Sequence, residues 1–79
     1  IGMSIAANKI PGIRAAAVSD CFTAQATREH NDANILCLGE RTVGPGLAMR
    51  IVDTYLAAQF QGGRHQTRLD MIAALEQDR

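Results

Sequence analysis

Several features are scarce in this 79-residue sequence, and each scarcity argues against a class of protein. No apolar run approaches the ~18–20 residues that a membrane-spanning helix requires, so we expect no membrane partner. No basic segment followed by an apolar one opens the chain, so we expect no secretory signal and a cytoplasmic location. The formal net charge is zero, which argues against a nucleic-acid partner because that kind of binding needs an excess or a cluster of basic residues.

Cysteine is also scarce. Cys21 and Cys37 form no CxxC motif, and no second cysteine pair lies at zinc spacing, so the sequence predicts no metal site. We expect two free thiols in a reducing compartment, with oxidation to a disulfide as the alternative.

The hydrophobic periodicity predicts alternating helices and strands. Helices are expected over 3–9, 20–31, 43–60 and 65–77, and buried strands over 13–18 and 35–39. Asp20 is expected to cap the second helix, with Phe22 facing inward. Apolar residues at helical spacing, Leu56 among them, predict one buried stripe over 43–60, and Leu69 and Ile72 a second seam.

The element order α-β-α-β-α-α is typical of a parallel sheet with crossover helices. Two parallel strands are too few for a stable sheet, because strands of that kind are buried on both faces by neighbours. We therefore expect residues 1–79 to be the C-terminal part of a single α/β domain whose first strands lie outside them. A complete miniature domain, made stable by oligomerisation, is the alternative.

The seven arginines outnumber the single lysine, and arginine is suited to a planar grip on phosphate. Arg64 and Arg68 are four residues apart, which places them on one helix face within reach of a single anion. They occupy the first turns, where the helix dipole disfavours cations unless an anion is bound. Gly62 and Gly63 allow the backbone to approach closely. This pattern predicts a phosphate clamp, with two solvated surface arginines as the alternative.

Other candidate residues lie beside the expected strands. His30 and Asn31 end a helix just before the strand at 35–39, opposite the carboxyl edge where ligands bind in an open α/β sheet. A functional His30 would therefore serve a site on another subunit; the alternative is a histidine stabilised by the helix dipole. Arg41 follows the strand directly and lies at its carboxyl edge. Structural or solvated roles are expected for Asn8, Lys9 and Arg14.

Four ordered segments resemble the ribose-5-phosphate isomerase type B family, whose wider group includes galactose-6-phosphate isomerase subunits. They read IGMSIAANKIPGIRAA, REHNDANILCLGER, GPGLAMRIVDTYL and FQGGRHQTRLDMI. The resemblance covers the whole chain and corresponds to the C-terminal half of the family's usual length. It implies a doubly wound α/β/α (Rossmann-like) parallel sheet, a homodimer or a dimer of dimers, a sugar-phosphate substrate, and no metal or organic cofactor.

The resemblance also implies an activity, which is the interconversion of ribose 5-phosphate and ribulose 5-phosphate through an enediolate. It gives His30 the catalytic role of assisting ring opening, which suits an imidazole because its ordinary pKa of about 6.5 lets it move protons near neutrality. Backbone N–H groups of a Gly-rich loop face the enediolate in this family. The residues that match substrate- or phosphate-binding positions are Ile1, Gly2, Asn31, Arg41, Arg64 and Arg68.

The catalytic base is where the sequence departs from one branch of the family. That branch has a glutamate at the position of Met3, and a methionine cannot take a proton. The other branch has a cysteine shortly before the equivalent of Ile1, with which neither Cys21 nor Cys37 aligns. The resemblance thus implies a base upstream of Ile1, and we expect the 79 residues alone to be inactive. Two alternatives stay open: an isomerase of allose or galactose 6-phosphate, and a non-catalytic phosphate-binding or interaction module.

Overall fold

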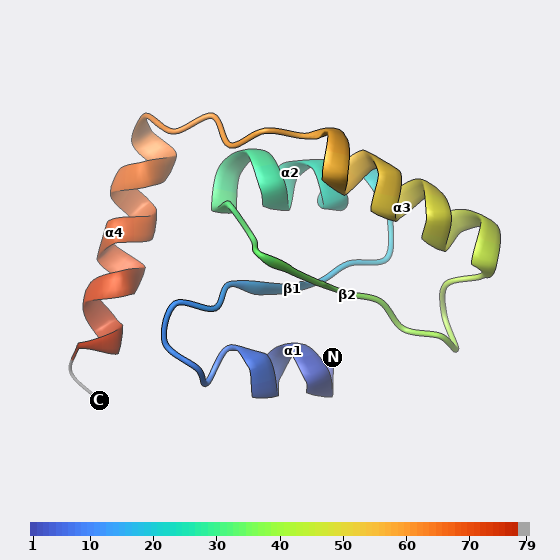
Figure 1. Cartoon of the computed structure of the whole chain (residues 1–79), viewed down its shortest axis with the longest axis horizontal. Helices are drawn as coiled ribbons and strands as arrows, with labels where there is room; N and C mark the ends of the chain where they lie inside the picture. The colour runs from blue at the N-terminus through green and yellow to red at the C-terminus, as the bar shows by residue number, and fades with distance from the viewer. Residues whose placement is uncertain (78–79) are drawn as a thin grey trace.

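The computed structural model describes residues 1–77 and places helices on both faces of a parallel pair of strands (Figure 1). The helices are α1 (Gly2–Ala7), α2 (Cys21–Asn31), α3 (Pro45–Ala57) and α4 (Arg64–Glu76), and the strands are β1 (Ala15–Ala17) and β2 (Ile35–Cys37). Helix α1 covers one face of the pair, and α2 and α3 cover the other. The expected element order and the α/β/α layering are confirmed.

The strands pair in register, with Ala15 opposite Ile35 and Ala17 opposite Cys37. Both strands are shorter than the sequence predicts. Ahead of β1, the side chain of Asn8 donates to the carbonyl of Ala15 at 2.9 Å and accepts from its N–H at 2.8 Å. Asn8 therefore has the structural role that was expected of it. Cys21 and Cys37 are both free, as expected.

Helix α3 begins and ends inside the range expected from the apolar pattern. Pro45 occupies the first turn, where its missing N–H costs nothing, and Ala58 returns to an extended conformation with ψ 153°. The prediction of one helix over 43–60 is therefore wrong at both ends. Val43 nevertheless joins the core, with 6% of its surface exposed, from the loop before the helix.

The core lies between the strands and the α2–α3 pair. Its buried members are Val18, Ala24, Val43 and Ile51. Ile51 is fully enclosed at the middle of α3, and burial of such a side chain contributes about 1.5–3 kcal/mol.

Two side chains that were expected in the core are exposed. Phe22 is 81% exposed because Ala24 and Thr27 face inward, and a residue two positions before Ala24 is turned ~200° away from it around the helix. Leu56 is 71% exposed on the outer side of α3.

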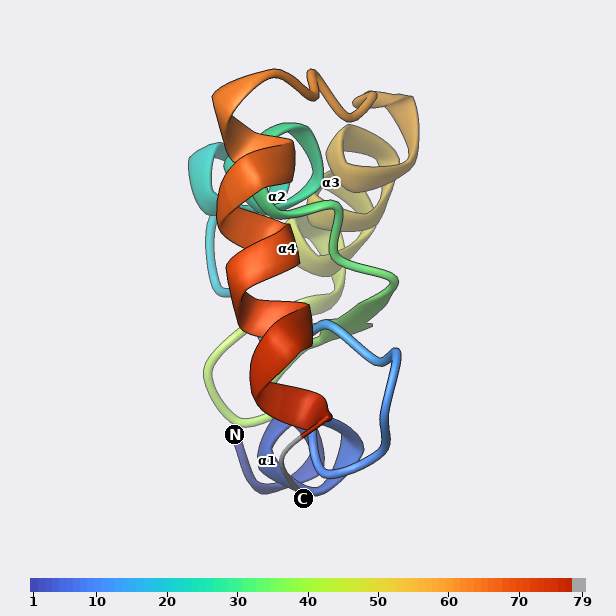
Figure 2. The same cartoon turned by 90° about the vertical axis from the view of Figure 1, so that its left-hand side faces the viewer.

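Helix α4 lies at one end of the molecule and packs mainly against α2. Figure 2 shows it extending from the level of α2 down to that of α1. Near its far end, the carboxylate of Glu76 accepts the N–H of Gly12 at 3.1 Å, which attaches α4 to the turn before β1. Of the second expected seam, Leu69 is buried and Ile72 is 52% exposed. None of the helices in the described part of the chain is long and apolar enough to cross a membrane.

Candidate functional site

The predicted site residues fall into two groups in space. His30 and Asn31 form the last turn of α2, and Arg64 and Arg68 lie in the first turns of α4, which packs against α2. Ile1 and Gly2 lie instead at the start of α1. The segment between β2 and α3, which carries Arg41, lies at the opposite end of the molecule from α4 (Figure 1).

The start of α4 is held beside α2 by the backbone. The N–H of Gln61 donates to the carbonyl of Glu29 at 3.0 Å, one residue before His30. Gly62 and Gly63 then take φ values of +69° and +59°, which residues other than glycine rarely adopt. This double turn directs the first turn of α4 onto the end of α2.

As a result, the imidazole of His65 stacks on that of His30. The ring centroids are 4.3 Å apart and the planes differ by 16°. His65 is 8% exposed, and its Nδ1 is buried without a hydrogen-bond partner among residues 1–77. Burial lowers the pKa of His65 below its usual value, and the neighbouring His30, Arg64 and Arg68 lower it further.

His65 was missed as a site residue by sequence reasoning. The signal that could have found it is its spacing from Leu69, four residues on, which puts both on the buried face of α4. The sequence does not predict that the buried face of α4 contacts His30.

Arg64 and Arg68 lie on the solvent side of α4 and are both exposed. Neither makes a salt bridge or a side-chain hydrogen bond within the part of the chain that is described. Two positive charges one turn apart, at the positive end of a helix, raise each other's energy until an anion binds. The exposed pair is compatible with the predicted phosphate clamp, which stays a prediction, and with the alternative of two solvated surface arginines.

The turn that follows Asn31 is held by a group of polar contacts. Asp32 adopts the left-handed conformation, with φ 46° and ψ 44°. Its carboxylate accepts from Arg28 at 2.7 Å and lies 3.5 Å from the guanidinium of Arg14, whose Nε also donates to the Asp32 carbonyl at 2.9 Å. The hydroxyl of Tyr55 donates to the carbonyl of Ala33. Arg14 thus has a structural role, and the end of α2 is fixed where His30 and Asn31 lie.

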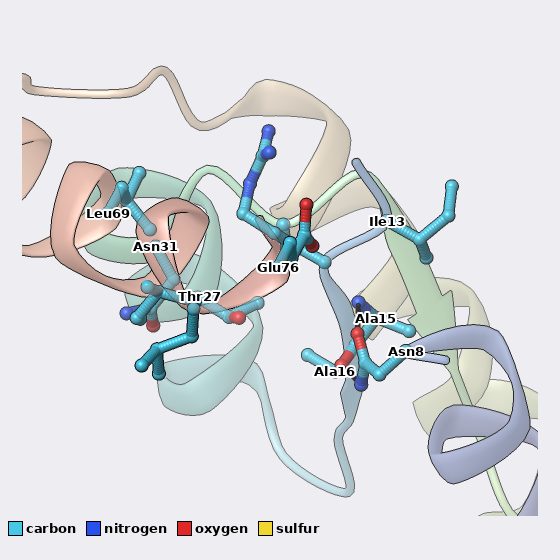
Figure 3. A pocket seen from close by; sticks show the side chains of 12 residues that line it. Asn8, Ile13, Ala15, Ala16, Thr27, Asn31, Leu69 and Glu76 are labelled. Carbon is cyan, nitrogen blue, oxygen red and sulfur yellow. Dashed lines mark hydrogen bonds between the residues drawn. The ribbon is translucent and has the colours of Figure 1, made fainter. Parts of the chain in front are cut away.

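A cavity of about 490 Å³ opens between α2, β1 and α4. Figure 3 shows Asn31, Thr27 and Leu69 on one side of it and Ala15 on the other. Most of its wall is apolar, and the guanidinium of Arg14 that lines it contacts Asp32, so the exposed arginine pair remains the candidate anion site.

The histidine, cysteine and carboxylate side chains of residues 1–77 do not gather anywhere in a group of three that could hold a metal ion. The side chains that meet where α4 packs on α2 are two imidazoles and two exposed arginines, which are residue types that can transfer protons and bind anions.

Comparison with known proteins shows the family to which the chain is similar. Residues 1–72 match the family described as Ribose/Galactose Isomerase. The chain is 54% identical over 79 residues to ribose-5-phosphate isomerase B of Escherichia coli, of which it covers 53%.

Solved structures agree with the sequence comparison. Ribose-5-phosphate isomerase B of Clostridium thermocellum superimposes with a TM-score of 0.97 at 60% identity, over 99% of this chain and 53% of that one. The Mycoplasma genitalium enzyme with bound ribulose 5-phosphate gives a TM-score of 0.97 at 44% identity, over 100% of this chain and 52% of that one. The chain thus spans about half the length of the relatives that it matches.

Proposed function

The chain belongs to the ribose/galactose isomerase family, and we propose that the full-length protein containing it interconverts ribose 5-phosphate and ribulose 5-phosphate. Residues 1–79 would form the C-terminal part of its single domain. The observation that carries the proposal is the contact of α4 with the end of α2, which puts two exposed arginines beside an imidazole pair. The solved relative with bound ribulose 5-phosphate supports the choice of substrate.

The two halves of this contact have different chemical tasks. Arg64 and Arg68 would bind the phosphate, which fixes one end of the sugar through charge-assisted hydrogen bonds. His30 would assist the opening of the furanose ring, which must precede isomerisation because the C2 proton becomes acidic only beside an open C1 aldehyde. Asn31, on the same turn, would bind the sugar hydroxyls.

The remaining groups would act on the enediolate. Backbone N–H groups at Ile1 and Gly2 would stabilise its negative charge, and Arg41 would bind substrate at the carboxyl edge of the strands. Met3 cannot serve as the base, so we assign proton abstraction to a part of the full-length protein outside these 79 residues. The isomerisation itself moves one proton from C2 to the base and one proton back to C1, while a second proton passes from the C2 hydroxyl to the C1 oxygen as the C2 carbonyl forms.

We also propose that the full-length protein is a homodimer, either alone or within a dimer of dimers, with sites built from both chains. The support is the separation within one chain between α4 and the segment that carries Arg41 (Figure 1). A C2 dimer lets the same two regions meet twice, once at each symmetric site. Exposed apolar side chains that could be covered in such an assembly include Met3, Ile5, Leu56, Ile72 and Leu75.

The test is turnover by the purified full-length protein. It should convert ribose 5-phosphate to ribulose 5-phosphate without added metal, and faster than it converts allose 6-phosphate or galactose 6-phosphate. A preference for either hexose phosphate would replace the proposed substrate within the same family. Phosphate binding without turnover of any of the three would show instead a non-catalytic phosphate-binding module.

A further inference from the structure

The ring of His65 lies against the proposed catalytic imidazole, yet the proposed function gives it no role. It follows Arg64 and precedes Arg68 in the sequence, and its ring contacts α2 by stacking on His30. The arginines are exposed, whereas His65 is 8% exposed. Its side chain therefore belongs to the interface between the two helices rather than to the anion-binding face.

The geometry of the pair restricts the orientation of His30. A half-buried side chain in the last turn of a helix keeps several rotamers unless a neighbour excludes them. The ring of His65, stacked at 4.3 Å with planes 16° apart, occupies one side of the His30 ring and restricts the orientations that His30 can adopt. His65 is itself fixed, because the Gln61–Glu29 hydrogen bond and the two glycines set the start of α4.

The surroundings of His65 also disfavour a charge on its ring. The groups that face it are His30 from α2 and Arg64 and Arg68 from α4, so a proton on His65 would meet positive charge from both helices. Its buried Nδ1 has no carboxylate or carbonyl within residues 1–77 to stabilise an N–H there. Burial and these neighbours lower the pKa of His65, which favours the neutral ring at neutral pH.

We propose that His65 is a positioning residue for ring opening: its neutral ring holds His30 in place and leaves the proton exchange with the sugar to His30. The inference rests on the proposed function. In this step His30 donates a proton to the ring oxygen as the C1–O bond breaks. The anomeric hydroxyl gives its proton to solvent, and C1 becomes the aldehyde carbonyl.

Ring opening can be measured apart from isomerisation as the exchange between the α and β anomers of ribose 5-phosphate, by saturation transfer at C1 on the full-length protein. His65→Ala should slow the catalysed exchange by about ten- to a hundred-fold, the loss expected when a catalytic group is misplaced. His65→Leu, which fills the space without a flat aromatic face, should behave in the same way. His65→Phe restores a neutral flat ring and should recover most of the exchange rate.

Two controls separate positioning from packing. Inhibition by inorganic phosphate should be nearly unchanged in the His65 variants, because both arginines remain. Isomerisation is measured here on a four-carbon aldose 4-phosphate, which needs no ring opening. Leu69→Ala removes another buried side chain from the same face of α4, and any loss that it causes should affect anomer exchange and this isomerisation equally. Equal loss of both activities in His65→Leu, or no loss, or the failure of His65→Phe to recover exchange, would each overturn the proposal.

The ring contact has a readout that does not depend on activity. Protons of His30 that lie over the His65 ring should resonate upfield in the full-length protein, move downfield in His65→Leu and return in His65→Phe. Unchanged chemical shifts of the His30 protons in His65→Leu would contradict the positioning role. If the wild-type protein turns over no aldose phosphate, the proposed function fails, while this spectrum still decides whether His65 orients His30.

Discussion

The guanidinium of Arg28 donates a 2.7 Å hydrogen bond to the carboxylate of Asp32, the residue that directly follows the His30–Asn31 pair. Asp32 has a positive φ of 46°, and Arg14 contacts it from the strand side. Through these two arginines, Asp32 links the end of α2 to the start of β1. It fixes the turn on which two of the candidate site residues depend.

Asp32→Ala should destabilise the full-length protein by about 1–3 kcal/mol. Placing an alanine in the left-handed conformation costs ~1–2 kcal/mol, and loss of a partly exposed ion pair costs up to ~1 kcal/mol. Asp32→Gly also removes the carboxylate, but glycine adopts the left-handed conformation without strain. The loss of stability in Asp32→Gly should therefore be clearly smaller than in Asp32→Ala. Urea denaturation measures both. Equal losses in the two variants would show that the backbone conformation is not the source of the cost.

Acid should weaken the packing of α4 on α2. The pKa of His65 is lowered from 6.5 in the folded chain. As the pH falls below 6.5, His65 therefore binds a proton more readily in the unfolded chain than in the folded chain. Stability from this source is complete above pH 6.5 and is lost as the pH falls below it. Urea midpoints measured across this range should decline more in the wild type than in His65→Phe. Parallel declines would assign the effect to other groups.

Arg64→Ala and Arg68→Ala should each raise KM for the phosphorylated sugar. Loss of a charge-assisted hydrogen bond costs about 1.5–3 kcal/mol, or roughly ten- to a hundred-fold in kcat/KM. Arg50→Ala, an exposed arginine on α3, is the matched control and should leave the kinetics unchanged. Wild-type kinetics in both α4 variants would mean that these arginines are solvated surface residues.

His30→Ala should lose activity selectively on sugars that cyclise. Ribose 5-phosphate is mostly a closed ring, whereas a four-carbon aldose 4-phosphate has no free hydroxyl with which to close a furanose. The variant should therefore keep far more of its activity on the four-carbon substrate, measured as kcat/KM. Equal losses on both substrates would move His30 to the proton-transfer step or to a role in folding.

A shared site predicts complementation between inactive variants. If each site takes His30 from one chain and Arg41 from the other, a mixture of His30→Ala and Arg41→Ala proteins forms heterodimers with one intact site. Equal mixing should restore roughly a quarter of the wild-type activity, because half of the dimers are then heterodimers with one site of two. If subunits are shown to exchange and no activity returns, each chain builds its own site.

The sequence by itself determined the order of the elements, because their signals are local. Asp20 caps α2 as predicted, its carboxylate accepting the N–H of Thr23 at 2.6 Å, and the Gly62–Gly63 pair breaks the chain before α4. The spacing of Arg64 and Arg68 likewise needs only a helix to place them on one face. The family resemblance then added roles for these residues that spacing alone left open.

Tertiary structure decided which faces are buried and which side chains meet. Phe22 is exposed and Val43 is buried from a loop because neighbouring elements, and not the apolar count of a segment, set what is enclosed. The stacking of His65 on His30 joins residues 35 positions apart through a reversal at two glycines with positive φ. Hydrophobic periodicity reports which face of a helix turns inward, but it carries no information about the partner of that face, so only the packing of α4 on α2 could bring the two rings together.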